Sequence, residues 1–169
     1  PEGALHLAGA AVCADDHSGL AALARAAVLC NDAELRKRGE DWAMQGDPTE
    51  GALVALAIKA GIDPDAVRAA LPRTDAIPFE SEHRLMATLH HDHNGHGFIY
   101  VKGAPERILE MCATQGDRRA LDADYWRRAA TDCAARGLRL LALGAKSVDA
   151  AQRDVHFADL EGGFTLLAL

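Results

Sequence analysis

An aromatic ring and a cation lie five residues apart in a polar stretch of the sequence, where Phe79 and Arg84 flank residues 80–83. The face of an aromatic ring stacks on a nucleobase, which contributes about 1–3 kcal/mol per base. A guanidinium pairs with phosphate oxygens, often through two bonds at once. The pair therefore suits a purine ring with a phosphate tail. The alternative is an ordinary entry into a β-strand with Phe79 in the core.

A lysine closes an apolar strand directly before a glycine, in the segment Val101–Glu106. Gly103 allows the backbone to be approached closely, and Pro105 suits the first position of a helix. Lys102 can bury its methylene stem against a ring and present its ammonium to phosphate. The alternative is a plain strand-to-helix turn with Lys102 exposed.

A carboxylate stands in the first turn of a predicted helix, in the segment Gly46–Leu53. Asp47 and Pro48 are favoured at the N-cap and first helical positions. Glu50 could therefore act locally, by reaching back from the third helical position to complete a capping box. As a site residue, Glu50 would instead accept a hydrogen bond from an adenine amino group.

The bulk composition argues against several classes of protein. The chain has 169 residues, a net charge of -7 and a pI of about 5.5. It is long enough for one domain with a real core, and its acidity disfavours nucleic-acid binding. The four cysteines show no C-x-x-C spacing, which argues for buried, reduced thiols and against a zinc ribbon. P-loop and G-x-G-x-x-G motifs are missing, so a nucleotide site must rest on scattered side chains.

The segment His90–His96 is rich in potential metal ligands. Histidine and aspartate bind zinc or nickel, but these residues surround a predicted hairpin turn, and strand alternation sends neighbouring side chains to opposite faces. We therefore predict no metal site in the chain.

The order of predicted elements mixes helices with hairpin-forming strands. Helices are expected over Ser18–Asn31 (with Ser18 as cap), Asp47–Ala60, Pro64–Ala70, Pro105–Cys112 and Asp122–Arg136. Strands are expected within Ala4–Cys13, at Ile77–Phe79, and over Leu85–His91, Gly97–Lys102, Leu138–Ala145 and Phe164–Leu169, with a polar loop at 32–46. The Asn94-Gly95 pair predicts a hairpin turn. This order favours an antiparallel or mixed sheet covered by helices over a doubly wound parallel sheet.

Read together, the three segments resemble the nucleotide-binding (N) domain of P-type cation-pumping ATPases, especially the calcium and sodium-potassium pump branch. The matching motifs are Lys102–Glu106 (KGAPE), Phe79-x-Ser81-x-x-Arg84-x-Met86 (F-x-S-x-x-[KR]-x-M), Gly46–Leu53 (GDPTE-A-L), Cys30-Asn31-Asp32 (CND) and Gly137–Ala142, similar to a strand that carries an arginine near the phosphates. The resemblance covers about residues 25–145. It implies an α+β fold whose twisted, largely antiparallel sheet has about six or seven strands flanked by helices.

Carried over by matching position, the resemblance implies a role for each residue on the base side of the site. Phe79 would stack on adenine, Lys102 would line the pocket near its floor, and Glu50 would accept from the adenine amino group. Ser81 would support the loop that carries Phe79, and Gly103 would permit close approach of the backbone.

The resemblance also implies what lies beyond the base. Arg84 and Arg139 would face the phosphates of Mg-ATP, although the family often has lysine where Arg84 stands. The chain contains no DKTGT phosphorylation motif, so we expect it to bind ATP without hydrolysing it, with the magnesium ligands mainly outside this domain.

The resemblance further implies the setting of the domain. Residues 1–169 are expected to form a single nucleotide-binding domain of bacterial origin. It would be a monomeric piece of a longer chain in which phosphorylation and actuator domains are its partners. That parent would be an integral plasma-membrane protein, with this domain on its cytoplasmic side. The alternative is a non-catalytic regulatory or interaction module that retains the fold.

Overall fold

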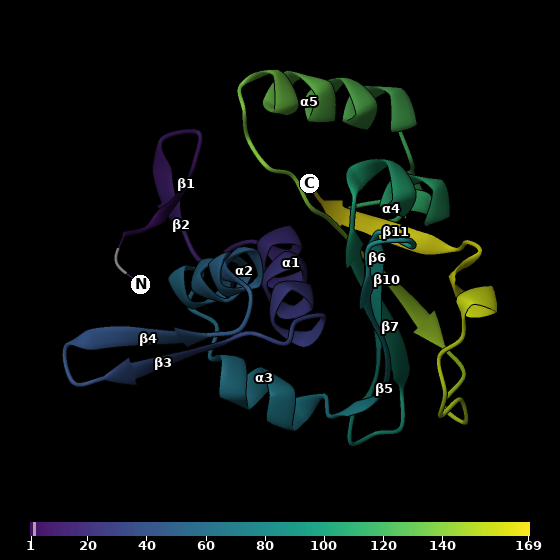
Figure 1. Ribbon diagram of the computed structural model, residues 1–169, viewed down its shortest axis with the longest axis horizontal. Coiled ribbons are helices and arrows are strands. Elements are labelled where there is room, and N and C mark those ends of the chain that lie inside the picture. Colours follow the sequence, from purple (N-terminus) through teal and green to yellow (C-terminus); the bar gives the residue numbers. More distant parts are fainter. Residues whose placement is uncertain (2) are drawn as a thin grey trace. The chain divides into compact units, whose positions relative to one another are not determined.

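The structure, a computed structural model, describes residue 1 and residues 3–169. Contacts between residues divide the chain into two compact units, residues 1–70 and residues 71–169. Each unit is described by itself below (Figure 1). The prediction that the chain forms a single nucleotide-binding domain stays a prediction.

The first unit is built on helices α1 (Ser18–Leu29), α2 (Pro48–Lys59) and α3 (Pro64–Ala70). Small residues on α1 and α2, among them Ala24 and Ala57, are fully buried in a shared apolar cluster. Such residues let helices approach each other closely. The helix predictions are confirmed within about two residues, the usual uncertainty of helix ends. The cap of α1 was predicted wrongly, because the Nδ1 atom of His17, and not Ser18, accepts from the N–H of Leu20 at 3.4 Å.

The predicted polar loop at 32–46 is wrong, because most of it forms a β-hairpin. Strands β3 (Glu34–Arg38) and β4 (Asp41–Gln45) pair antiparallel, with Leu35 opposite Met44. Met44 packs against the first turns of α2, where a Cβ on Gly51 would lie 2.9 Å from its Cγ. Four of the five residues of β3 are charged, which hid the strand character of this segment from the sequence pattern. A shorter hairpin, β1 (Leu5–Leu7) with β2 (Ala10–Val12), confirms the predicted strand pair near the N-terminus.

The second unit contains a seven-stranded sheet in the order β5-β6-β7-β10-β11-β8-β9. Its strands are β5 (Arg73–Glu80), β6 (Leu85–His91), β7 (Gly97–Gly103), β10 (Ala142–Val148), β11 (Phe164–Ala168), β8 (Cys112–Gln115) and β9 (Arg119–Ala120). Among the described strands, the pairings are antiparallel apart from that of β11 with β8. The predicted α+β fold with a largely antiparallel sheet is confirmed.

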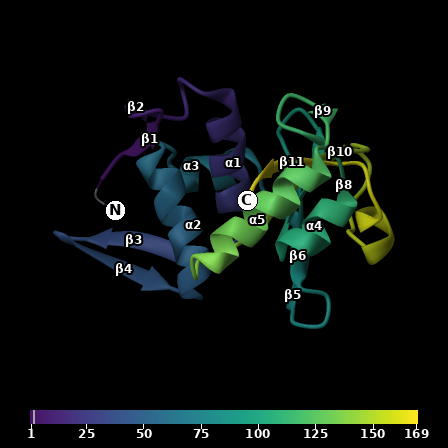
Figure 2. The same ribbon diagram turned by 90° about the horizontal axis from the view of Figure 1, so that it is seen from above.

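Helix α4 (Pro105–Met111) packs against β7, β10 and β11, and α5 (Ala123–Ala135) packs on α4 (Figure 2). The core of this unit joins one face of the sheet, including Leu85, Ile99 and Val101, to Ile108 of α4. The short helix η1 (Phe157–Leu160) adds Leu160 to the same core.

The strand predicted at Leu138–Ala145 begins four residues later, at Ala142. The cause is the end of α5. The N–H of Gly137 donates to the carbonyl of Ala134 at 2.9 Å, and that of Leu138 donates to Cys133 at 3.2 Å. These two bonds form a Schellman motif, with Gly137 at a φ of +75°. Leu138 is therefore still tied to the helix and cannot join the sheet.

Candidate nucleotide-binding site

Most of the predicted site residues gather at one end of the central strands. β5 ends where β6 begins, since Glu80 pairs with Leu85. Leu85 pairs in turn with Gly103 at the end of β7, and Gly103 pairs with Ala142 at the start of β10. This edge carries the site residues of the second unit, which are Phe79, Ser81, Arg84, Lys102, Gly103 and Arg139. Antiparallel pairing thus brings together residues up to sixty positions apart.

Phe79 is 56% exposed, so the alternative that it belongs to the core is wrong. The reason is local, because the pairing of β5 with β6 is interrupted by a bulge between Ile77 and Glu80. A bulge re-aims the side chains of the strand that carries it. The ring of Phe79 is consequently presented to solvent at the edge of the sheet, where it can stack on a planar ligand.

The turn that follows Phe79, residues 81–84, is held by contacts at both ends. Ser81 is exposed in this turn. The N–H groups of His83 and Arg84 donate to the carbonyl of Glu80 at 3.2 and 2.8 Å. The ring of His83 also packs against that of Phe157, with centroids 4.3 Å apart. The loop is therefore anchored by its backbone and by η1, and Ser81 makes no side-chain bond within the described residues that would assign it a supporting role.

Arg84 adopts a left-handed backbone conformation, with a φ of +53°. Its carbonyl accepts from the N–H of Ala104 at 3.0 Å. Its Nη1 donates to Oε1 of Glu106 at 2.5 Å, and the two side chains are 56% and 57% exposed. The predicted phosphate-facing guanidinium is thus paired with a carboxylate in the first turn of α4. The sequence pattern gave no role to Glu106 beyond its place in the motif.

Gly103 is required by the close approach of β6. A Cβ at this position would lie 2.3 Å from the carbonyl oxygen of Arg84 and 2.9 Å from Cα of Leu85. Both neighbours are backbone atoms, which cannot move aside without breaking the pairing. The group that approaches Gly103 closely is therefore the backbone of Arg84 and Leu85. This contact places the Arg84 backbone against the start of α4.

Lys102 is 4% exposed, so the alternative that it is merely a surface residue is wrong. Its strand neighbours Ile99 and Val101 lie in the core cluster, with Val101 directly before it. Alternation along a strand therefore turns Lys102 toward the opposite face of the sheet. Its register partners are Met86 on β6 and Leu143 on β10. These side chains flank the lysine stem, which is the arrangement that a lysine with a buried stem needs.

Arg139 lies in the segment between α5 and β10, three residues before Ala142, and is exposed. Because Ala142 pairs with Gly103, the connection that carries Arg139 leads into β10 at the strand end where β7 finishes. The sequence placed Arg139 within a strand, whereas the structure places it in the connection before that strand. That Arg139 faces the phosphates stays a prediction.

Glu50 belongs to the first unit and is positioned by the segment that follows α1. Asp47 caps α2, its Oδ1 accepting from the N–H groups of Thr49 and Glu50 at 2.8 and 3.3 Å. The Glu50 carboxylate accepts from the N–H of Asp32 at 3.1 Å, and its carbonyl accepts from Nδ2 of Asn31 at 2.9 Å. The carboxylate is thus directed toward the residues after α1, beyond the purely local capping role.

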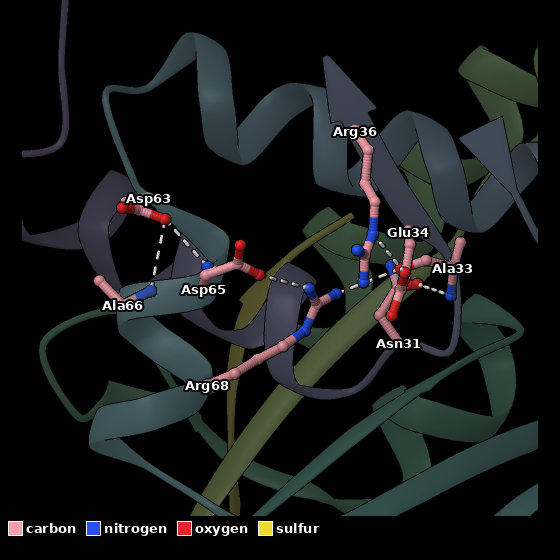
Figure 3. Close-up of polar contacts among 8 residues, drawn as sticks. All are labelled: Asn31, Ala33, Glu34, Arg36, Asp63, Asp65, Ala66 and Arg68. Atoms are coloured by element: carbon pink, nitrogen blue, oxygen red, sulfur yellow. Dashed lines mark hydrogen bonds and ion pairs between the residues drawn. The ribbon is translucent and has the colours of Figure 1, made fainter. Parts of the chain in front are cut away.

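The residues after α1 are themselves braced by α3. Nη2 of Arg68 donates to the carbonyl of Ala33 at 3.1 Å, while Nη1 lies 3.6 Å from Oδ1 of Asp65 (Figure 3). The N–H of Ala33 donates to Oδ1 of Asn31 at 2.8 Å. Asn31 was noticed in the sequence only as part of a motif. Its burial, which depends on tertiary packing, is the signal that singles it out.

Side chains of the His90–His96 segment contact other groups of the protein, both within the turn and in distant segments. Asp92 accepts from the N–H of His96 and from its ring Nδ1, both at 2.8 Å, and the hydrogen bond from His96 holds the pKa of Asp92 below its usual value. His91 instead contacts Oγ1 of Thr74 at 2.7 Å and Nη1 of Arg153 at 3.0 Å. Among the described residues, no three His, Cys, Asp or Glu side chains are grouped to hold a metal ion. That the chain binds no metal stays a prediction.

The arrangement at the edge of the sheet is suited to binding. An exposed ring, a lysine with a buried stem and two exposed guanidinium groups offer stacking and phosphate pairing. The chemistry that these residue types provide is recognition of an aromatic, anionic ligand.

Comparison with known proteins gives a consistent result. The sequence profile of a family described as "P-type ATPase, cytoplasmic domain N" matches residues 19–169. Cation-transporting ATPase pma1 of Synechocystis sp. is 42% identical over 146 residues, which cover 84% of this chain and 16% of that protein. Probable cation-transporting ATPase F of Mycobacterium tuberculosis is 45% identical over 123 residues, covering 70% and 14%. Calcium-transporting ATPase 1 of Lactococcus lactis is 40% identical over 90 residues, covering 53% and 10%.

The chain thus spans about one sixth or less of the length of the relatives that it matches. Among the described residues, the helices lack the length and apolar character that crossing a membrane demands.

Proposed function

Because this chain belongs to the family of P-type ATPase cytoplasmic N domains, we propose that it binds ATP for an ATP-driven cation transporter. The observation that carries the proposal is the edge of the sheet, where an exposed aromatic ring, two arginines and a lysine with a buried stem come together. The names of its relatives, which include cation-transporting and calcium-transporting ATPases, support the same function.

On the base side, Phe79 stacks on adenine, and the Lys102 stem lies against the ring with its ammonium toward the phosphates. The exposure of Phe79 supports this role, because a ring already in solvent needs no rearrangement to stack. Glu50 accepts from the adenine amino group. The hydrogen bond from the N–H of Asp32 supports this role by holding the carboxylate in one direction.

On the phosphate side, Arg84 and Arg139 pair with the phosphate chain. A guanidinium presents its donors in a fork that matches two phosphate oxygens. Arg84 exchanges its Glu106 partner for phosphate, whereas Arg139 approaches from the connection before β10. The negative charge of the whole chain makes these local cations decisive, because the overall field repels a triphosphate.

In the whole protein, the bound ATP is presented to an aspartate of a separate phosphorylation domain, with the magnesium ligands mainly outside this chain. Catalysis of phosphoryl transfer depends chiefly on such positioning and on electrostatic stabilisation. The chain by itself therefore binds nucleotide without hydrolysing it. The parent is a membrane protein whose N domain faces the cytoplasm, with phosphorylation and actuator domains as its partners.

A titration of the isotope-labelled chain with ATP, followed by NMR, tests the proposal. Millimolar ATP should shift the resonances of Phe79, Lys102 and Gly103. Tripolyphosphate, which lacks the base, should shift those of Arg84 and Arg139 and leave Phe79 in place. If millimolar ATP shifts none of these resonances, the chain does not bind ATP, and a non-catalytic interaction module becomes the better description.

A further inference from the structure

The side chain of Asn31 is buried and ties three segments of the first unit together. It is 3% exposed. Its Nδ2 donates to the carbonyls of Ala27, in the last turn of α1, and Glu50, in the first turn of α2, both at 2.9 Å. Its Oδ1 accepts from the N–H of Ala33 at 2.8 Å. Both amide protons and the amide oxygen are thus used, which fixes the group in one orientation.

The bond between Asn31 and Ala33 shapes the backbone between them. An asparagine that accepts from the N–H two residues later forms an Asx turn. In this turn the intervening N–H, that of Asp32, points to Oε2 of Glu50 at 3.1 Å. Figure 3 shows the hydrogen bond between Asn31 and Ala33, and that from Arg68 to the carbonyl of Ala33. Asn31 therefore aims the donor that orients the carboxylate.

Two hydrogen bonds that hold Glu50 therefore depend on Asn31. Its carbonyl is bound directly by the amide, and its carboxylate is bound through the Asp32 N–H. A carboxylate can accept about four hydrogen bonds, so accepting from a backbone N–H does not prevent it from also accepting from a ligand. Recognition by hydrogen bonds depends on such orientation, because a bond weakens steeply when its angle departs from linearity.

We propose that Asn31 is a positioning residue that sets the Glu50 carboxylate for recognition of the base, and thereby contributes to selection of adenine over purines that carry a carbonyl at position 6. The inference rests on the proposed function, in which Glu50 accepts from the adenine amino group. Asn31 itself does not touch the nucleotide. It acts by fixing the turn and the helix start between which Glu50 is held.

The test compares binding of ATP and ITP, since ITP has a carbonyl where ATP has the amino group. In Asn31→Ala, the affinity for ATP should fall about tenfold, the loss expected when a hydrogen bond to a charged group is misaligned, while that for ITP changes less than about twofold. Glu50→Gln should narrow the ATP-to-ITP preference to a similar extent. Adding Asn31→Ala to Glu50→Gln should narrow it no further. Asn94→Ala, in the β6–β7 turn, is the matched control.

The outcomes separate the two proposals. If the unmodified chain binds neither nucleotide, the proposed function fails. If it prefers ATP and Asn31→Ala weakens ATP and ITP equally, Asn31 is merely structural and the inference fails alone.

Two further measurements keep the test decisive if Asn31→Ala does not fold. Asn31→Ser can retain the turn, because a serine hydroxyl accepts from the N–H two residues later. It loses the hydrogen bonds that Nδ2 donates to Ala27 and Glu50, so its ATP-to-ITP preference should be narrower than that of the unmodified chain. An unchanged preference would overturn the inference. In the folded Glu50→Gln protein, the Asp32 amide proton should move upfield as its charged acceptor is lost. An unmoved resonance would also overturn it.

Discussion

Neutralising Glu106 should strengthen the binding of ATP. Its carboxylate accepts from Arg84 at 2.5 Å, and that bond has to be given up when Arg84 turns to phosphate. Glu106→Gln removes the negative charge while keeping a side chain of the same size at the start of α4. The substitution should therefore release Arg84 without disturbing the helix start that places it.

The magnitude follows from the exposure of the pair. With both side chains more than half exposed, the ion pair is worth about 0–1 kcal/mol, or up to about fivefold in affinity. Two unit charges about 8 Å apart in water interact by about 0.5 kcal/mol before screening by salt, so loss of the repulsion between Glu106 and the phosphates adds a gain of that order. We expect ATP to bind about two- to fivefold more tightly to Glu106→Gln. AMP should gain less, because it lacks the outer phosphates.

Calorimetric titration of ATP and AMP measures these affinities at one fixed salt concentration. Glu110→Gln is the matched control, because Glu110 lies on the same helix, changes the net charge equally, and pairs with Arg107 at 3.4 Å. It should leave the affinity for ATP within about twofold. In an Arg84→Ala background, which should itself weaken ATP more than AMP, Glu106→Gln should have no effect beyond that of the control.

Either of two results would refute the role of Glu106 as a competitor for Arg84. If Glu106→Gln weakened ATP, the carboxylate would be part of the nucleotide site and not a competitor for Arg84. If the gain persisted in Arg84→Ala, it would come from the general field of the protein and not from the release of this arginine.

Three other substitutions or reagents test separate features. Phe79→Ala should weaken ATP and AMP alike by about 1–3 kcal/mol, and an effect confined to ATP in the same titrations would show that the ring does not stack on the base. Gly103→Ala should lower the free energy of unfolding by about 1–3 kcal/mol, because its Cβ would meet the carbonyl of Arg84, and unchanged denaturant unfolding would contradict that close approach. Burial raises the pKa of Cys112 to about 12, so iodoacetamide at pH 8 should label Cys133, which is partly exposed, well before Cys112. Equal labelling rates by mass spectrometry would contradict the burial of Cys112.

Locally encoded features of the fold were predictable from the sequence. Asp47 and Pro48 mark the start of α2, and the Gly137 end of α5 is a Schellman motif that a glycine after a helix suggests. Such signals act within a few residues, so a short window contains them. The Phe79–Met86 motif could be found for a similar reason, since its residue types and their spacing are visible without knowing the fold.

Strand boundaries were less accessible because they depend on pairing with distant residues. The sequence of the β3–β4 hairpin is typical of a polar loop, since four of the five residues of β3 are charged. The contact of the hairpin with α2, through Met44 and Gly51, is not visible in the sequence. The start of β10 at Ala142 depends on where the hydrogen bonds at the end of α5 stop. Hydrophobic periodicity, the main signal of secondary structure in a sequence, indicates neither boundary.

The sequence by itself supplied the residue types of the proposed site, because an aromatic ring, a lysine before a glycine and two arginines are visible without the fold and predict the class of ligand. Only the tertiary structure decided their environment. Register placed Met86 and Leu143 beside Lys102, and packing buried that lysine while leaving Phe79 exposed. It also paired Arg84 with Glu106 across 22 positions. Burial and partner choice arise from contacts between segments far apart in the chain, and a linear pattern does not contain them.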